Sequence, residues 1–278
     1  MRCIPLQSGS AGNCTYVESQ GVRLLIDAGI SAARARKRLA DHGVDIADVD
    51  AVLITHEHSD HIGAAGVFAR KLGLPLYLTE KTWRAARDQI GVAGEPAMIG
   101  DTQRIDFGAG WGEPTPPPAG GIRCFRAGDV LQFGPVRVET LATPHDAVDG
   151  VVYCVDDGRS RLGVCTDFGH VFPGLRALMA SLDGVVMESN YDERMLESGP
   201  YPMFLKRRIS GPRGHISNLE AAELIKSDGR RLRWACLAHL SENNNRPELA
   251  MDAHRAALAD SIALHLTERY GASAALEL

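Results

Sequence analysis

The densest group of side chains that could do chemistry lies between residues 55 and 61, directly after an apolar segment. Its sequence, THEHSDH, holds three imidazoles and two carboxylates. His56 and His58 are two residues apart, so both rings can face one ion in an extended segment that leaves a strand. Asp60 and His61 fall at the turn into a following helix and point elsewhere. The spacing therefore indicates two metal ions, and the alternative of a solvated polar loop is disfavoured by the apolar surroundings.

Candidate ligands recur at the ends of later apolar runs. His145 follows a run ending at Ala142, Asp167 follows one ending at Cys165, and His239 follows one that begins at Trp234. A single His or Asp at a strand end is usually a surface residue. Its repetition after several runs is what favours a common site.

Other polar residues allow two interpretations each. Asp27 ends an apolar run and either partners a ligand histidine or forms the turn. His170, three residues after Asp167, lies either at the rim of the site or on the surface, and the usual exposure of histidines outside a core favours the surface. Asp156 and Asp157 precede Gly158 and indicate a hairpin turn.

The elements that would position these residues are short strands and helices in alternation, which indicates an α/β protein. A loop rich in Gly and Pro is expected from residue 108 to residue 121. The expected strands are 3–6, 15–18, 22–26, 49–54, 74–78, 130–133, 136–142, 151–155, 162–165, 185–187 and a final strand at 234–237. The expected helices are 31–39, 62–72, 81–90, 217–225 and 247–259.

Composition limits the expected number of domains, the location, the disulfide content and the net charge. The 278 residues are 45% hydrophobic, which suits one domain over residues 1–278. No apolar run reaches the roughly 20 residues of a membrane span, and no signal sequence opens the chain, so a cytoplasmic protein is expected. The 6 cysteines lack a C-x-x-C pair and are expected to be reduced, with no disulfide. The net charge of −5 gives no overall attraction to nucleic acid. The oligomeric state is not predicted.

The ordered ligand string resembles that of the metallo-β-lactamase fold, an αββα sandwich in which two β-sheets are flanked by helices. More narrowly, several blocks resemble the YycJ/WalJ-type members, which are related to tRNase Z and RNase J. These blocks are SGSAGNC at 8–14, IDAG at 26–29, ATPHD at 142–146, ESNYD at 188–192, GHISN at 214–218 and HLSENN at 239–244.

The resemblance implies a set of site residues. His56, His58 and His145 would hold one ion, Asp60, His61 and His239 a second, and Asp167 would bridge them. Asp60 and Asp167 would also belong to the catalytic group, with Asp27 and Asn190 supporting the ligands. Two divalent ions can share a water, lower its pKa and stabilise charge on the attacking and leaving oxygens at phosphorus. His and Asp ligands suit Zn, Mn and Fe alike.

The activity that the resemblance implies is a metal-dependent phosphodiesterase, a 5′-to-3′ DNA exonuclease in which a metal-bridging hydroxide attacks phosphorus. Only 71 residues separate Asp167 from His239, too few for the extra domain of RNase J-like enzymes. The Pro-rich loop carries Glu113 and no Lys or Arg, which disfavours tRNase Z-like processing. A small-molecule hydrolase of cyclic phosphodiesters or thioesters is the alternative, since fold does not fix function. A non-catalytic metal-binding regulator is disfavoured because all seven ligand positions are filled.

Two further features concern the substrate. Lys206, Arg207, Arg208 and Arg213 precede His215 and form either a phosphate-binding edge or a solvated face. His215 itself has no coordination vacancy to fill, so it is expected to be catalytic as a general acid. The alternative is that His215 only packs beside Ser217, which opens a capping box with Glu220.

Overall fold

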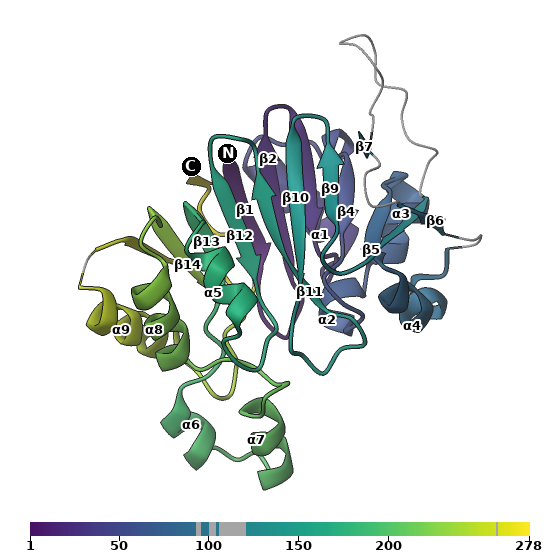
Figure 1. Cartoon of the computed structure of the whole chain (residues 1–278). Helices are drawn as coiled ribbons and strands as arrows, with labels where there is room; N and C mark the ends of the chain where they lie inside the picture. The colour runs from purple at the N-terminus through teal and green to yellow at the C-terminus, as the bar shows by residue number, and fades with distance from the viewer. Residues whose placement is uncertain (93–95, 100–103, 106–120, 260) are drawn as a thin grey trace.

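In the computed structural model, the chain forms two mixed β-sheets packed face to face with helices on both outer sides (Figure 1). The structure describes residues 1–92, 96–99, 104–105, 121–259 and 261–278. The expected α/β class and αββα sandwich are confirmed. The predicted Gly/Pro-rich loop lies outside the described residues, Gly121 excepted.

The first sheet begins with an antiparallel meander and continues with parallel strands. Its order across the sheet is β16 (Leu276–Glu277), β1 (Arg2–Gln7), β2 (Cys14–Ser19), β3 (Val22–Ile26), β4 (Ala51–Leu53), β5 (Leu76–Thr79), β8 (Ile122–Phe125) and β6 (Ala97–Met98).

The second sheet has the same mixture, because its strands between residues 130 and 165 pair in antiparallel fashion and the later ones, up to residue 266, pair in parallel. Its order is β15 (Ala263–Leu266), β14 (Trp234–Ala238), β13 (Gly184–Glu188), β12 (Arg161–Cys165), β11 (Val151–Asp156), β10 (Val136–Ala142), β9 (Val130–Phe133) and β7 (Arg104–Ile105).

Alternation along the strands creates three apolar layers. In β11, Tyr153 faces the other sheet whereas Cys154 faces the helices, as the period of two requires. The outer face of the first sheet is covered by α1 (Ala32–Asp41), α3 (Ala65–Leu72) and α4 (Glu80–Ile90). The outer face of the second is covered by α5 (Pro173–Met179), α8 (Asn218–Asp228) and α9 (Pro247–Leu258). A short 3-10 helix, Ile46–Asp48, precedes β4.

One expected helix is divided. Residues 62–72 were expected to be one helix, but the structure has α2 (Ser59–Ile62) and then α3, with a break at Gly63 and Ala64. Backbone bonds from Asn13 to the Asp60 carbonyl, from Ala28 to the His61 carbonyl and from Ala64 back to Ala28 hold α2 against the neighbouring loops. These bonds fix α2 in a separate orientation from α3.

Other corrections concern short elements. Residues 234–237 were expected to be the final strand, but β15 and β16 follow them. The short helices α5, α6 (Glu193–Ser198) and α7 (Met203–Ile209) were not predicted, since six or seven residues give too little periodicity. All six cysteines are buried and free. In the described part of the chain, no helix is long and apolar enough to cross a membrane.

Candidate metal centre

The candidate ligands meet at one edge of the sandwich, where strands of both sheets end. β4 leads to His56 and His58, and α2 carries Asp60 and His61. The second sheet contributes residues that follow its strands: His145 after β10, Asp167 after β12 and His239 after β14. The carboxyl ends of adjacent parallel strands share one edge of a sheet, which is why residues far apart in sequence converge here.

His56, His58 and His145 form the first group. Their ligand atoms all lie within 4.8 Å of one another, and His56 Nε2 is 3.0 Å from His58 Nδ1. The ring of His145 is fixed by a 3.0 Å hydrogen bond between its Nδ1 and the Gly214 carbonyl. This bond leaves His145 Nε2 directed at the cluster, so the three imidazoles can face one point.

Asp60, His61 and His239 form the second group. Asp60 Oδ2 lies 3.5 Å from His61 Nε2 and 3.6 Å from His239 Nε2. The remaining His61 nitrogen, Nδ1, is 2.7 Å from Asp27 Oδ2. The two nitrogens of the His61 ring are therefore divided between Asp27 and the shared centre.

Asp167 lies between the two groups. Its Oδ2 is 3.3 Å from His61 Nε2, and its Oδ1 is 3.7 Å from His145 Nε2 and 3.4 Å from His239 Nδ1. The residue is buried and adopts a left-handed backbone with φ of 66°. A single carboxylate thus contacts members of both groups.

The backbone is unusual at this edge. Among the residues that the structure describes, five other than glycine have a positive φ, and three of them, Asp27, Asp167 and His239, belong to the site. Such conformations cost of order 1–2 kcal/mol each for most side chains. Their concentration here indicates that the turns are set by the site and not by local preference.

Asp27 and Asn190 occupy supporting positions. Asp27 Oδ1 accepts hydrogen bonds from the Thr55 backbone N–H at 2.8 Å and from its hydroxyl at 2.9 Å, while Oδ2 contacts His61. Asp27 also lies in the turn, with φ of 65°, so it both contacts His61 and shapes the turn. Asn190 donates from Nδ2 to the His239 carbonyl at 2.8 Å.

Glu188 was missed as a functional residue, although it opens one of the motif blocks. Its carboxylate is fully buried, and Oε1 lies 2.7 Å from His215 Nδ1 and 3.0 Å from His239 Nδ1. Oε2 accepts from the backbone N–H groups of Asp167 and Phe168 at 3.0 and 3.1 Å. Its place at the end of β13, beside the strands that precede Asp167 and His239, is the signal that could have identified it.

His215 lies within the cluster. Its ring centroid is 5.2 Å from that of His145 and 5.3 Å from that of His239, and its side chain is 22% exposed. Beyond Ile216 begins α8, whose N-terminus has the expected capping box of Ser217 and Glu220. With Nδ1 held by Glu188, the imidazole presents Nε2 as its free nitrogen.

Burial and charge act in opposite directions on the buried acids and histidines. Burial disfavours the His61 cation, but the carboxylates of Asp27, Asp167 and Asp60 outweigh it and raise the His61 pKa to about 9. His56 lacks such compensation, so burial and the nearby His61 charge hold its pKa well below the usual value. Despite burial, surrounding histidines keep the pKa of the Asp167 carboxyl well below its usual range. The acids and imidazoles of the centre therefore set one another's protonation.

Three buried polar atoms in the centre test whether metal ions fit. His145 Nε2, His239 Nε2 and Asp167 Oδ2 have no hydrogen-bond partner. Buried polar atoms are rarely left so, and imidazole nitrogens with carboxylate oxygens are the donors that Zn, Mn and Fe accept. The arrangement fits divalent ions.

The four basic residues do not form one uniform surface. Arg213 donates to the carbonyls of His145 and Ala147, and Lys206 donates to the carbonyl of Glu197. Arg208 pairs with Asp146 at 2.6 Å while remaining exposed, and Arg207 is exposed. Lys206 and Arg213 are thus held by backbone groups, whereas Arg207 and Arg208 are exposed.

Other candidates lie outside the cluster. His170 is exposed, with Nδ1 2.8 Å from the Pro212 carbonyl, in agreement with the surface interpretation. Asp156 and Asp157 accept backbone hydrogen bonds in the β11–β12 hairpin, as predicted.

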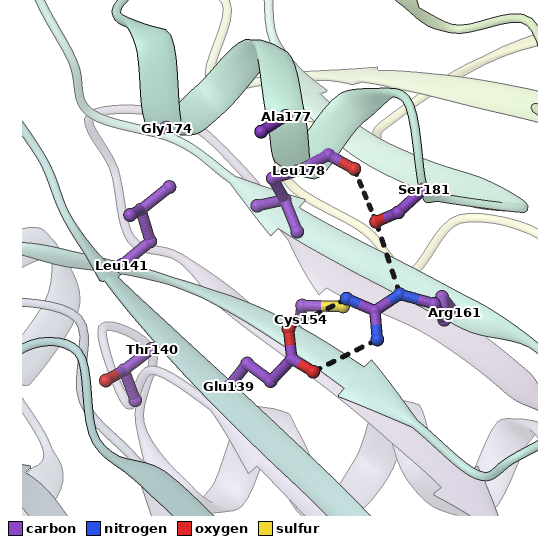
Figure 2. A pocket seen from close by; sticks show the side chains of 9 residues that line it. All are labelled: Glu139, Thr140, Leu141, Cys154, Arg161, Gly174, Ala177, Leu178 and Ser181. Carbon is purple, nitrogen blue, oxygen red and sulfur yellow. Dashed lines mark hydrogen bonds and ion pairs between the residues drawn. The ribbon is translucent and has the colours of Figure 1, made fainter.

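A cavity of about 350 Å³ lies under α5, and Figure 2 shows Arg161 paired with Glu139 across its wall. None of the predicted ligands lines this cavity.

Comparison with known proteins adds a family assignment. The model of the family described as "Metallo-beta-lactamase superfamily" matches residues 8–176. An exodeoxyribonuclease YycJ of Bacillus anthracis is 36% identical over 249 residues, which is 88% of this chain and 84% of the relative. An exodeoxyribonuclease WalJ of Streptococcus pneumoniae is 36% identical over 246 residues, covering 88% and 83%.

A solved structure shows the same fold at low identity. The metallo-beta-lactamase fold protein YhfI of Bacillus subtilis superposes with a TM-score of 0.70 and 18% identity, covering 100% of this chain and 98% of that one. The fold is thus shared with a protein of low sequence identity.

Proposed function

The chain belongs to the metallo-beta-lactamase superfamily, and from that premise we propose that it is a dinuclear metal-dependent phosphodiesterase that degrades DNA from the 5′ end. The observation that carries the proposal is the position of Asp167, whose carboxylate contacts both histidine-containing groups. The relatives named exodeoxyribonuclease support the choice of DNA.

The proposed ligands are the seven residues predicted from sequence. His56, His58 and His145 would hold one ion, while Asp60, His61 and His239 would hold the other. Asp167 would bridge them, and Asp27 and Asn190 would position His61 and His239. Two divalent ions supply a nucleophile at neutral pH and stabilise charge on the phosphate. Zn, Mn and Fe all suit these donors.

The residues of the chain itself perform the remaining tasks. Glu188 holds His215 by its Nδ1, so the ring cannot turn away from the centre. The protonated ring would then donate from Nε2 to the leaving oxygen of the nucleotide, which is general acid catalysis. Exposed Arg207 and Arg208 would contact phosphates of the polymer. The free buried cysteines support a cytoplasmic location.

The test compares 5′- and 3′-end-labelled duplex DNA, single-stranded DNA and RNA with the chromogenic diester bis-p-nitrophenyl phosphate. We expect metal-dependent release of nucleotides from the 5′ end of DNA, and loss of activity with EDTA. Hydrolysis of the chromogenic diester without cleavage of any nucleic acid would instead support the small-molecule hydrolase. Cleavage of RNA in preference to DNA would support a ribonuclease.

A further inference from the structure

Helix α7 presents apolar side chains to solvent. None of its residues is buried, and the side chains of Met203 and Phe204 are 61% and 74% exposed. Phe204 has the largest exposed fraction among the exposed large apolar residues that the structure describes. Figure 1 shows α6 and α7 standing off from the sandwich at its lower end, where α2 also lies. Met203 and Phe204 are adjacent, and exposed apolar side chains that lie together are a feature of binding surfaces.

The position of Phe204 is fixed relative to the metal centre through Arg208. Residues four apart lie on one face of a helix, so Phe204 is one turn from Arg208 on the same side of α7. The Arg208 guanidinium is 2.6 Å from Asp146, whose Oδ1 is 3.3 Å from His145 Nε2. Phe204 therefore lies about one helical turn from a residue whose side chain reaches the edge of the centre.

The helix is anchored at that position. The Lys206 ammonium donates to the Glu197 carbonyl at 2.6 Å, and the backbone N–H of His215 donates to the Ile209 carbonyl at 2.8 Å. α7 therefore continues directly into the loop that carries His215. A ligand contact made by Phe204 would be held in register with the centre.

The chemistry of this face fits one kind of partner. Arg207 and Arg208 are three and four residues beyond Phe204, so two exposed guanidinium groups border the ring. Aromatic rings beside cations bind single-stranded nucleic acid, because the ring stacks on a base while the cations meet phosphates.

We propose, on the basis of the function proposed above, that Phe204 stacks on an unpaired nucleobase of the strand being degraded. Arg207 and Arg208 then contact the flanking phosphates. Because the faces of a base are accessible only outside a duplex, Phe204 favours single strands and frayed ends over blunt duplex.

The test measures kcat/KM of the metal-loaded full chain on single-stranded oligonucleotides that carry one abasic nucleotide, placed in turn at each position near the 5′ end. Phe204→Ala should lower kcat/KM on the intact strand about ten- to a hundredfold. At one position the abasic site should lower the wild-type rate similarly, and there Phe204→Ala should cause little further loss. The Phe204→Trp variant keeps an aromatic ring and should retain the wild-type rate. Val130→Ala, at another exposed apolar residue, is the control and should also match wild type.

Three results would overturn the inference. Phe204→Ala could leave the rate on DNA unchanged, or its loss could add fully to that of the abasic site at every position. It could also change the sedimentation of the protein without changing the rate, which would assign this face to a second copy of the chain. If the protein still hydrolyses DNA in any of these three cases, the proposed function stands and only the role of Phe204 is rejected. A wild-type protein that hydrolyses no oligonucleotide overturns both.

Discussion

At the scale of the residue, several histidines of the centre each have one ring nitrogen held by a neighbouring carboxylate or backbone carbonyl. Glu188 holds His215 and His239, Asp27 holds His61, and Gly214 holds His145. Each bond fixes a ring and directs its other nitrogen inward, which is how outer partners tune a metal site. The chemistry therefore depends on residues that need not touch a metal.

Replacing Asp167 should show whether one carboxylate joins the two groups. We expect Asp167→Asn to lose at least one of two bound ions and to lower turnover by at least about a hundredfold, since a neutral amide ligates poorly. Metal analysis and phosphodiesterase rates measure both effects. Asp129→Asn, in a remote turn, is the control. A fully metallated, fully active Asp167→Asn protein would remove the bridging role.

His215 should affect rate without affecting metal content. We expect His215→Ala to retain its ions while its rate on DNA falls about 10²- to 10⁴-fold, the usual contribution of a general acid. The loss should be smaller on bis-p-nitrophenyl phosphate, whose leaving group needs no proton. His170→Ala, at the exposed histidine nearby, serves as control. If His215→Ala instead loses metal, the residue is a ligand, and the nearness of its Nδ1 to Asp167 at 3.7 Å would be the reason.

At the scale of the element, the two sheets are joined at a hairpin. The Ser19 hydroxyl at the end of β2 donates to the buried Asp157 carboxylate in the β11–β12 turn at 2.6 Å. The same carboxylate accepts from the backbone N–H groups of Arg159 and Ser160. Burial opposes the charge, but these bonds outweigh it and lower the Asp157 pKa.

Asp157 should therefore contribute stability that depends on pH. We expect Asp157→Asn to lower the free energy of unfolding by about 1–3 kcal/mol at pH 7, the range for bonds to a charged group. Because the folded pKa is lowered, this contribution is complete above the unfolded value of about 3.9 and is lost as the pH falls through the folded pKa.

Urea unfolding at several pH values, with Ser19→Ala and the double variant, measures the coupling between the two side chains. Additive effects of the two substitutions would show that the hydroxyl and the carboxylate act separately. An equal effect of Asp157→Asn at pH 3 and pH 7 would contradict the electrostatic origin.

Sequence patterns predicted the longer elements and the candidate ligands that converge at one edge, but not the short connections. Turn residues and apolar runs located β3 and the capped helix α8 closely, because local preferences decide both. α2 was joined to α3 in error, since its orientation depends on backbone bonds to Asn13 and Ala28, which lie far away in sequence. Glu188 was missed for a similar reason: the alignment of β12, β13 and β14 brings it beside the strand ends that precede Asp167 and His239. The assignment of residues 1–278 to one domain stays a prediction.

At the scale of the whole molecule, the candidate ligands come from both sheets. His56 and His61 follow strands of the first sheet, whereas His145, Asp167 and His239 follow strands of the second. Bound ions would therefore connect the two halves of the sandwich at this edge. Folding and metal binding should be coupled.

Removing the metals should lower the melting temperature. A ligand present at a thousand times its dissociation constant stabilises the folded state by about 4 kcal/mol. For a chain of this size that corresponds to about 8–16 °C. Differential scanning fluorimetry before and after EDTA, with zinc or manganese added back, measures the shift. Equal melting temperatures with and without chelator would mean that the site is rigid without ions.

The left-handed turns at Asp27 and Asp167 also bear on how this centre would decay in evolution. A descendant freed from selection for activity would still have to fold, and these two backbone positions would still penalise most side chains. Asn and Gly tolerate a positive φ, and Asn keeps a hydrogen-bonding oxygen of the same shape. Inactive descendants should therefore carry Asn or Gly at positions 27 and 167 more often than Ala or Val, which would mark lost catalysis within a preserved fold.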